Sequence, residues 1–203
     1  QIRMRRKDNA DRSKKIIVIV IAFLMFGSIF SIIFLGFSSG GSLTGTGTGT
    51  IEYNDLTFVL RNNFWTVIHE NIPLSFVFPP NELEILLFDD KVTPLLRNAV
   101  EIDITSDFDD RFAEGIALSQ YQMNLVLQPY NKFIRQGFTT EQENFPAILC
   151  SDATPKVPVV YFKSSNSTKV SLDGNCIIAE AATIQDTVRL KDRLVYGMLG
   201  IIN

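Results

Sequence analysis

The chemistry open to this chain is limited first by its cysteines, of which there are only two. Cys150 and Cys176 lie 26 positions apart, each beside an apolar run that is typical of a strand. In an oxidising compartment, a disulfide between them would contribute about 3 to 4 kcal/mol by restricting the unfolded chain. Two buried free thiols are the alternative, whereas redox catalysis is disfavoured because the chain has no C-x-x-C motif. We therefore expect a structural disulfide between Cys150 and Cys176.

A second group of residues with possible chemistry is acidic. Asp103, Asp107, Asp109 and Asp110 fall between a strand-like segment and a helical one, a position at which open α/β sheets often bind ligands. Asp107, Asp109 and Asp110 could supply carboxylate oxygens to a hard cation such as Ca²⁺ or Mg²⁺. However, the complete spacing of an EF-hand loop is absent, and aspartates before a helix also cap its positive end. Helix capping is the favoured interpretation, and a metal site at these three residues is the alternative.

The chain lacks the usual motifs of catalysis. His69 is its single histidine, which excludes His-rich metal sites and leaves one candidate for a His-dependent triad. No G-x-S-x-G nucleophile motif occurs, and the glycines of residues 45–49 are not followed by the lysine of a phosphate-binding loop. We expect His69 to face solvent at a strand end, and we expect no catalytic residue and no cofactor.

One modification motif is present. Asn166, Ser167 and Thr168 form an N-x-S/T acceptor sequence within an expected turn. Glycosylation of Asn166 and an ordinary unmodified turn are both consistent with this triplet.

Near the start of the chain, residues 16–37 carry no charge and are almost entirely apolar. As a helix, at about 1.5 Å per residue, they would reach roughly 33 Å, which exceeds a hydrocarbon core of about 30 Å. A cleaved signal peptide, a buried core helix and an archaeal pilin-type leader fit less well, given the length of this block, its lack of a polar face and its lack of an early acidic residue. The sequence therefore predicts a transmembrane helix in contact with membrane lipid.

Charge is distributed unevenly around this block. Residues 1–15 contain seven of the 19 Lys and Arg residues but two of the 22 Asp and Glu residues. The positive-inside rule then places the basic tail, residues 1–15, in the cytoplasm and the chain beyond the helix outside it. Residues 38–50, rich in Ser, Gly and Thr, predict a flexible linker, and residues 51–203 predict one globular domain. The acidity of that domain disfavours nucleic acid as a partner.

The pattern of the domain predicts a mixed α/β fold. Aromatic and β-branched residues in 56–60, 64–68 and 74–78 predict a three-stranded antiparallel meander, which Pro79 and Pro80 end. Residues 81–98 fit either a helix or, around 86–88, a buried strand. Residues 100–104 alternate as a strand does, and Ser106 with Asp109 resembles the start of a helix that runs to Pro129.

The last third of the domain predicts strands followed by a helix. Residues 157–162 read as a strand, 164–167 as a turn, and 169–179 as a return strand kinked at 173–175, so we expect a hairpin. Thr183 and Asp186 resemble a capping box, and the apolar spacing after them predicts a closing helix that docks on the sheet.

Two resemblances add expectations. Val157-Pro158-Val-Val-Tyr-Phe-Lys163, with the return strand and helix after it, resembles the last ββα part of thioredoxin-like domains, although no paired-cysteine motif precedes it. The order of basic tail, apolar anchor, linker and domain, with Arg189-Leu-Lys-Asp-Arg-Leu-Val-Tyr-Gly197 near its end, resembles uncharacterised N-terminally anchored single-pass membrane proteins of small-genome archaea. The second resemblance implies a cell envelope location and no known activity.

These observations favour a non-catalytic function. We expect a membrane-anchored extracytoplasmic domain that binds another membrane or envelope protein, or serves as an accessory subunit of a membrane complex. An envelope enzyme, either thioredoxin-like or metal-dependent, is the alternative. It would require reactive cysteines or a cation at the aspartate cluster.

Overall fold

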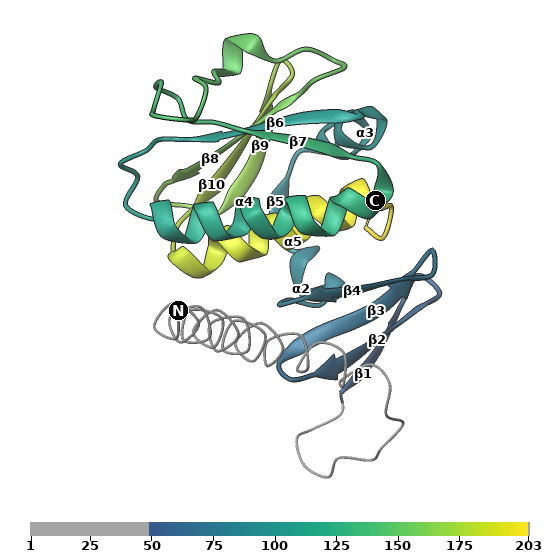
Figure 1. Cartoon of the computed structure of the whole chain (residues 1–203). Coiled ribbons are helices and arrows are strands. Elements are labelled where there is room, and N and C mark those ends of the chain that lie inside the picture. Colours follow the sequence, from purple (N-terminus) through teal and green to yellow (C-terminus); the bar gives the residue numbers. More distant parts are fainter. Residues whose placement is uncertain (1–48, 203) are drawn as a thin grey trace, which may run out of the picture. The chain divides into compact units, whose positions relative to one another are not determined.

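The first part of the described chain is an antiparallel meander. The computed structural model describes residues 49–202, and its first four strands, β1 (Thr50–Tyr53), β2 (Leu56–Arg61), β3 (Phe64–His69) and β4 (Ile72–Phe76), pair in chain order (Figure 1). Three two-residue turns join them, at Asn54-Asp55, Asn62-Asn63 and Glu70-Asn71, with φ between 45° and 66°. Positive φ at both central residues defines the type I′ turn, whose twist matches that of paired strands. The meander therefore has four strands and not the predicted three, and β1 begins one residue inside the segment predicted as linker.

The predicted transmembrane segment, residues 16–37, lies outside the described residues. Among residues 49–202, no helix has both the length and the apolar character needed to cross a bilayer.

A second sheet contains six strands in the order β5-β9-β10-β8-β6-β7. Their bounds are β5 (Leu87–Phe88), β6 (Glu101–Ser106), β7 (Phe133–Gln136), β8 (Val159–Ser164), β9 (Lys169–Asp173) and β10 (Cys176–Ala181). β7, β6, β8 and β10 are parallel to one another, and β9 is antiparallel to β10. The described residues form a mixed α/β domain, as the sequence predicted.

Helices cover one face of this sheet. The helices are α2 (Pro80–Leu83), α3 (Val92–Asn98), α4 (Ala113–Leu127) and α5 (Ile184–Met198), with short 3₁₀ turns η1 (Gln128–Tyr130) and η2 (Cys150–Asp152). α4 and α5 lie side by side on the sheet (Figure 1). Ile104, Phe162 and Ile177 from the sheet share one buried core with Met123 of α4 and Leu194 of α5. The ambiguous segment 81–98 contains helix and strand, in the order α2, β5 and α3, but the strand is not buried as predicted, since Leu87 is 70% exposed.

The predicted hairpin across residues 164–167 is wrong. β8 does not pair with β9, because β10 lies between them and is parallel to β8. The tight turn is instead at the predicted kink, where Gly174 has φ of 61° and joins β9 to β10. The chain from Ser164 to Lys169 crosses the end of β10, and the Ser165 amide donates to the Ala181 carbonyl at 2.8 Å. The two strands on which the thioredoxin-like resemblance rested therefore do not pair with each other.

The predicted start of α4 is also wrong, although the helix itself is confirmed. Ser106 is the last residue of β6, and the helix begins at Ala113. Asp110, not Asp109, closes the turn before it, since its Oδ1 accepts a hydrogen bond from the Phe112 amide at 2.7 Å. Ile116, Met123 and Leu127 lie on the buried face of this helix.

α5 begins as predicted, with a capping box. The Thr183 amide donates to Asp186 Oδ2 at 3.0 Å, and the Asp186 amide donates to Thr183 Oγ1 at 3.3 Å. Burial alone would raise the pKa of Asp186, but hydrogen bonds from Thr183 and Thr168 and the charge of Arg189 outweigh burial and lower it. Two orphan amide groups are thereby satisfied, and a carboxylate lies at the positive end of the helix dipole.

The side of α5 away from the six-stranded sheet holds the end of the meander. Asp192 is fully buried, and its Oδ2 accepts hydrogen bonds from the amides of Val77 and Phe78, both at 3.0 Å. The buried ammonium of Lys191 donates to Asp192 Oδ1. One turn later, the Tyr196 hydroxyl donates to the Phe78 carbonyl at 2.8 Å. The two amides lie just after β4, so a buried charge pair fixes the exit of the meander to α5.

Removing this carboxylate should destabilise the domain strongly. Asp192→Ala leaves a buried ammonium and two amides without their acceptor, and we expect the free energy of unfolding to fall by about 3–5 kcal/mol. Urea denaturation followed by the fluorescence of Trp65, the single tryptophan, measures this directly. Asp109→Ala, at an exposed aspartate, is the matched control and should change stability by less than about 0.5 kcal/mol. Equal stability of the two variants would contradict a structural function for the buried pair.

The capping box should contribute a pH-dependent stability. Because the folded-state pKa of Asp186 is lowered, its contribution is complete above the unfolded pKa of about 3.9 and is lost as the pH falls through the folded value. We expect Asp186→Asn to lower the free energy of unfolding by about 1 kcal/mol at pH 7, with the deficit shrinking below about pH 4. Urea denaturation of both proteins between pH 7 and pH 3 tests this. A deficit that stays constant across the range would contradict it.

Candidate functional site

The parallel strands bring three polar residues together near one edge of the sheet. Asp107 was predicted from the sequence, whereas Thr139 and Tyr161 were not. β6, β7 and β8 point the same way, so the residues that follow β6 and β7 lie beside the end of β8. Asp107 follows β6, Thr139 follows β7 and Tyr161 lies within β8. The carboxyl edge of parallel strands is where open α/β sheets usually bind ligands. Of the predicted acidic cluster, Asp107, Asp109 and Asp110 follow β6 at this edge, whereas Asp103 lies within the strand.

Asp107 is held by hydrogen bonds on both carboxylate oxygens. Thr139 Oγ1 donates to Oδ1 at 2.5 Å, and Tyr161 Oη donates to Oδ2 at 2.7 Å. Burial and the hydrogen bond to Asp107 raise the pKa of Tyr161 well above its usual value, so the phenol keeps its proton and remains a donor. The Asp107 side chain therefore joins the loops after β6 and β7 to β8 as a structural tie.

The other two predicted metal ligands, Asp109 and Asp110, have environments that differ from that of Asp107. Both oxygens of Asp110 accept backbone amides, Oδ1 from Phe112 at 2.7 Å and Oδ2 from Ser164 at 2.7 Å. Asp109 is exposed. Among residues 49–202, no three His, Cys, Asp or Glu side chains gather in a way that could hold a metal ion. The geometry of Asp107, Asp109 and Asp110 thus gives no support to the metal site, and Asp110 caps the turn before α4.

Three phenylalanines from two loops form a row at the same edge, which we call the aromatic row: Phe108, Phe138 and Phe145. The rings of Phe108 and Phe138 have centroids 5.4 Å apart and lie edge to face, as do those of Phe138 and Phe145 at 5.3 Å. Phe138 is half-buried, while Phe108 and Phe145 are 58% and 43% exposed. Edge-to-face contacts stabilise aromatic pairs by about 0.5–1.5 kcal/mol each beyond burial. The row is therefore an ordered apolar surface that is open to solvent.

The loop that carries two of these rings, residues 137–158, is long but tied to the sheet. The Phe138 amide donates to the Pro146 carbonyl at 3.1 Å, and the Ile148 amide donates to the Phe138 carbonyl at 2.8 Å. Gly137 permits this close approach, because a Cβ there would lie 2.4 Å from the Pro146 oxygen. Long loops with no regular structure of their own are uncommon in compact domains and are often functional.

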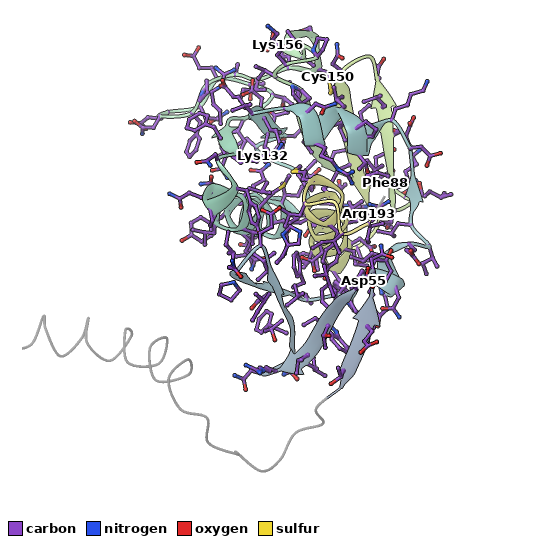
Figure 2. All side chains as sticks on the ribbon, turned by 90° about the vertical axis from the view of Figure 1, so that its right-hand side faces the viewer. Asp55, Phe88, Lys132, Cys150, Lys156 and Arg193 are labelled. Atoms are coloured by element: carbon purple, nitrogen blue, oxygen red, sulfur yellow. A yellow bond between two sulfur atoms is a disulfide. The ribbon has the colours of Figure 1, made fainter. Side chains whose placement is uncertain are left out.

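The disulfide fixes the middle of this loop. Cys150 and Cys176 are bonded, with their Cα atoms 5.1 Å apart, in agreement with the expected pairing (Figure 2 labels Cys150). Around them Ile148 and Val159 form a small buried cluster on the face of the sheet that the helices do not cover, against which Tyr161 packs. The bond therefore joins the loop to the first residue of β10.

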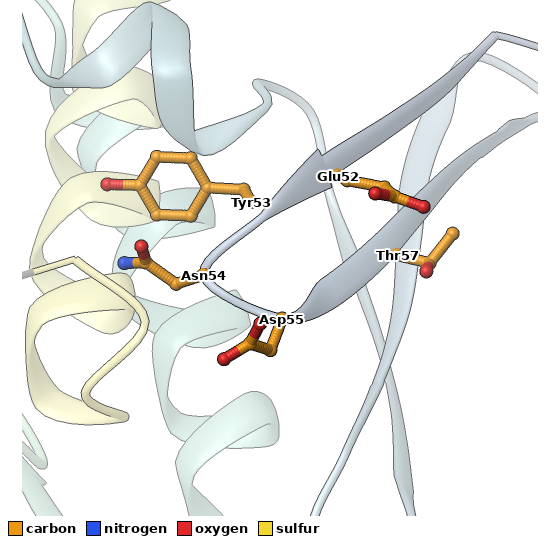
Figure 3. Close-up of a pocket in the computed structure, with 5 residues that line it drawn as sticks. All are labelled: Glu52, Tyr53, Asn54, Asp55 and Thr57. Atoms are coloured by element: carbon orange, nitrogen blue, oxygen red, sulfur yellow. The ribbon is translucent and has the colours of Figure 1, made fainter.

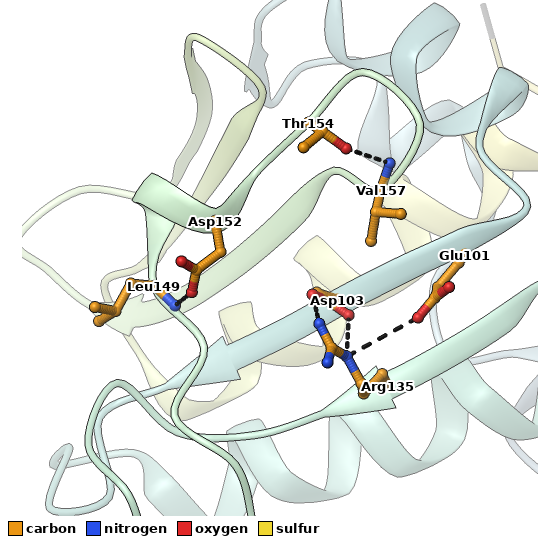
Figure 4. A network of polar contacts seen from close by, with 7 residues as sticks. All are labelled: Glu101, Asp103, Arg135, Leu149, Asp152, Thr154 and Val157. Atoms are coloured by element: carbon orange, nitrogen blue, oxygen red, sulfur yellow. Dashed lines mark hydrogen bonds and ion pairs between the residues drawn. The ribbon is translucent and has the colours of Figure 1, made fainter.

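A second polar network supports the same face of the sheet. Arg135 of β7 donates through Nε to Asp103 Oδ1 at 2.8 Å and through Nη2 to Oδ2 at 2.5 Å, and its Nε lies 3.9 Å from Glu101 (Figure 4). The hydrogen bond to Asp103 raises the pKa of Arg135. In the neighbouring loop, Asp152 Oδ2 accepts from the Leu149 amide at 2.9 Å. Asp103, predicted with the acidic cluster, is thus a buried partner of a bidentate arginine and not part of an open site.

The remaining predicted residues have the following environments. His69 ends β3, as predicted, but it is half-buried and does not simply face solvent. Its Nδ1 lies 3.1 Å from the Tyr130 hydroxyl, and that hydroxyl donates to the His69 carbonyl at 3.2 Å. This pairing connects the meander to η1.

Asn166, the predicted glycosylation acceptor, is exposed in the loop between β8 and β9, and exposure is a requirement for glycosylation.

Hollows in the described surface do not gather reactive groups. One, of about 370 Å³, is an open depression at the β1–β2 turn, lined by Glu52, Tyr53, Asn54, Asp55 and Thr57. These side chains diverge (Figure 3), and Tyr53 turns away to donate to Glu84 at 2.5 Å. Burial, followed by that hydrogen bond, raises the pKa of Tyr53 to about 12. A second hollow, about 290 Å³, lies between the start of α4 and Ile184 of α5. Neither is enclosed as small-molecule pockets usually are.

No family model, no curated protein and no solved structure matches this chain. The function must therefore be inferred from the surface itself, on which the aromatic row is a set of exposed and half-buried rings in mutual contact. The sequence did not predict this row, because Phe108 is 30 residues or more from Phe138 and Phe145 in the chain. No local sequence pattern indicates that residues of separate loops are in contact.

Breaking the disulfide should destabilise the domain measurably. Replacing Cys150 and Cys176 by alanine frees a loop of 26 residues, and we expect the free energy of unfolding to fall by about 3.5 kcal/mol. Urea denaturation with and without dithiothreitol measures the effect. Reductant should lower the stability of the natural protein to that of the double variant and leave the double variant unchanged. An effect of reductant on the double variant, or none on the natural protein, would contradict the structural function of the bond.

Proposed function

We propose that this protein is a single-pass membrane protein whose extracytoplasmic domain binds another membrane or envelope protein and catalyses no reaction. The aromatic row is the observation on which this proposal depends. Exposed aromatic residues are enriched at protein interfaces, where they contribute large contact area at low cost in conformational entropy. Phe108 and Phe145 have this character, and the Asp107 hydrogen bonds and the disulfide hold their loops in place.

The membrane part of the proposal is supported by residues 1–37. The uncharged block 16–37 is long enough to span, and the basic residues precede it. The disulfide in the domain is consistent with an oxidising compartment outside the cytoplasm. The resemblance to anchored archaeal proteins supports the same location.

A binding function is preferred to catalysis because the reactive groups of the domain are occupied. The two cysteines are bonded to each other, and Cys176 is 1% exposed, which disfavours thiol exchange. Both oxygens of Asp107 and of Asp110 accept hydrogen bonds. The exposed rings of Phe108 and Phe145 at the carboxyl edge are suited to contact rather than to proton transfer.

The interaction is tested by capture of partners from gently solubilised membranes. Phe108→Ser combined with Phe145→Ser removes both exposed rings, and since interface aromatics often contribute 1–2 kcal/mol or more each, we expect capture of a reproducible partner to fall at least about tenfold. Phe133→Ser is the matched control, because Phe133 is 61% exposed but starts β7 at the other end of the strand from Phe138. It should capture the partner as the natural protein does. A monomer with no reproducible partner, or equal capture by both variants, would contradict the proposal.

Location is tested separately on cells. The full chain should stay with the lipid fraction after a carbonate wash, and a protease added outside sealed cells should cleave beyond residue 50. Release by carbonate, or complete protection from the protease, would contradict the proposed topology.

A further inference from the structure

The carboxylates beside the aromatic row indicate what kind of surface it binds. Asp109 follows Phe108 directly, Glu141 precedes the turn that carries Phe145, and Glu143 lies within that turn. That turn is closed by two backbone hydrogen bonds, from the Gln142 amide to the Phe145 carbonyl at 3.3 Å and from the Phe145 amide to the Gln142 carbonyl at 3.0 Å. All three acidic side chains are exposed. We call Asp109, Glu141 and Glu143 the acidic rim.

Few cations compensate this charge. In residues 107–112 and 137–158 together, six Asp and Glu side chains stand against Arg111 and Lys156, and from β7 Arg135 faces Asp152. The guanidinium of Arg111 is engaged, since it donates to the Ser165 carbonyl and lies 4.6 Å from the centre of the Phe112 ring. An apolar surface bordered by uncompensated carboxylates attracts cations and repels phosphates and acidic proteins.

We propose that the aromatic row, with its acidic rim, binds a segment of the partner protein in which Lys or Arg residues lie next to apolar side chains. The apolar side chains contact Phe108 and Phe145, and the cations pair with the rim carboxylates or lie over the exposed rings. Charge complementarity decides for this occupant against a second copy of the acidic domain, whose rim would face the same charge. This inference rests on the proposed binding function and names the chemistry of the partner.

The direct test uses three synthetic peptides of 12 residues and one protein sample. Each peptide has the same five Leu and one Trp, and the other six positions are all Lys, all Glu or all Ser. The full chain is placed in nanodiscs of zwitterionic lipid, so that the peptides are not drawn to an anionic bilayer, and empty nanodiscs are subtracted. We expect the Lys peptide to bind at least about tenfold more tightly than the Glu and Ser peptides, and its affinity to fall as salt rises.

Two sets of substitutions locate the binding. Phe108→Ser with Phe145→Ser, and separately Asp109→Asn with Glu141→Gln and Glu143→Gln, should each weaken the Lys peptide about tenfold or more. The matched controls are Phe133→Ser for the rings and Glu52→Gln with Asp55→Asn for the charges. Figure 2 shows Asp55 far from Cys150 and Lys156 of the loop, beyond Arg193. All of these residues are exposed or in surface turns, so the variants should fold, and unchanged urea denaturation verifies it.

The outcomes separate this inference from the proposed function. Equal binding of the Lys and Glu peptides, or equal weakening by the row and control variants, would overturn the cationic segment. If capture of the natural partner depends on Phe108 and Phe145 but not on the acidic rim, the binding function stands and the proposed partner chemistry falls. If capture depends on neither set, both fall.

Discussion

The described domain depends on one helix that is enclosed by the rest of the fold. α5 packs against α4, α3, α2 and β10, and the end of the meander is hydrogen-bonded to its other side. A helix in this position would be expected to be apolar throughout, yet Lys191, Asp192 and Arg193 are all buried. Burying charge costs free energy unless each group is paired, so these three positions constrain what surrounds them.

The surroundings of α5 meet that constraint in different ways. Asp192 is satisfied by Lys191 and by two amides that β4 leaves open where it ends. Arg193 lies with its guanidinium 3.9 Å from the centre of the Phe88 ring, next to β5 (Figure 2). Each of these contacts has a fixed geometry, whereas apolar packing tolerates sliding. The charges of α5 therefore specify where the meander and β5 must lie, in addition to holding them there.

The aromatic row, at the carboxyl edge of the sheet, is also held by contacts of fixed geometry. A loop of this length would cost much conformational entropy to order, and the helices give it no support because they lie on the other side. Its order comes from local ties: the disulfide, the close approach at Gly137, and the Thr139 hydroxyl on Asp107. A rigid base beneath exposed rings lowers the entropy that binding must offset, which is what a recognition surface requires.

The sequence by itself determined the local elements and some of their chemistry. Alternating aromatic and β-branched residues specify β2, β3 and β4, and the Thr183 and Asp186 capping box specifies the start of α5, because these signals act over a few residues. The cysteine pairing could be predicted because the chain has only two cysteines and hence one possible pair. Strand order depended on the tertiary structure, since β9 had two possible partners and the tight turn at Gly174 favoured β10. The tertiary structure also decided which partners Asp103, Asp107 and Asp110 bind. It brought three phenylalanines that are distant in the chain into contact as well. Contacts between residues far apart in the chain leave no periodic trace in sequence, and only the folded domain brings them together.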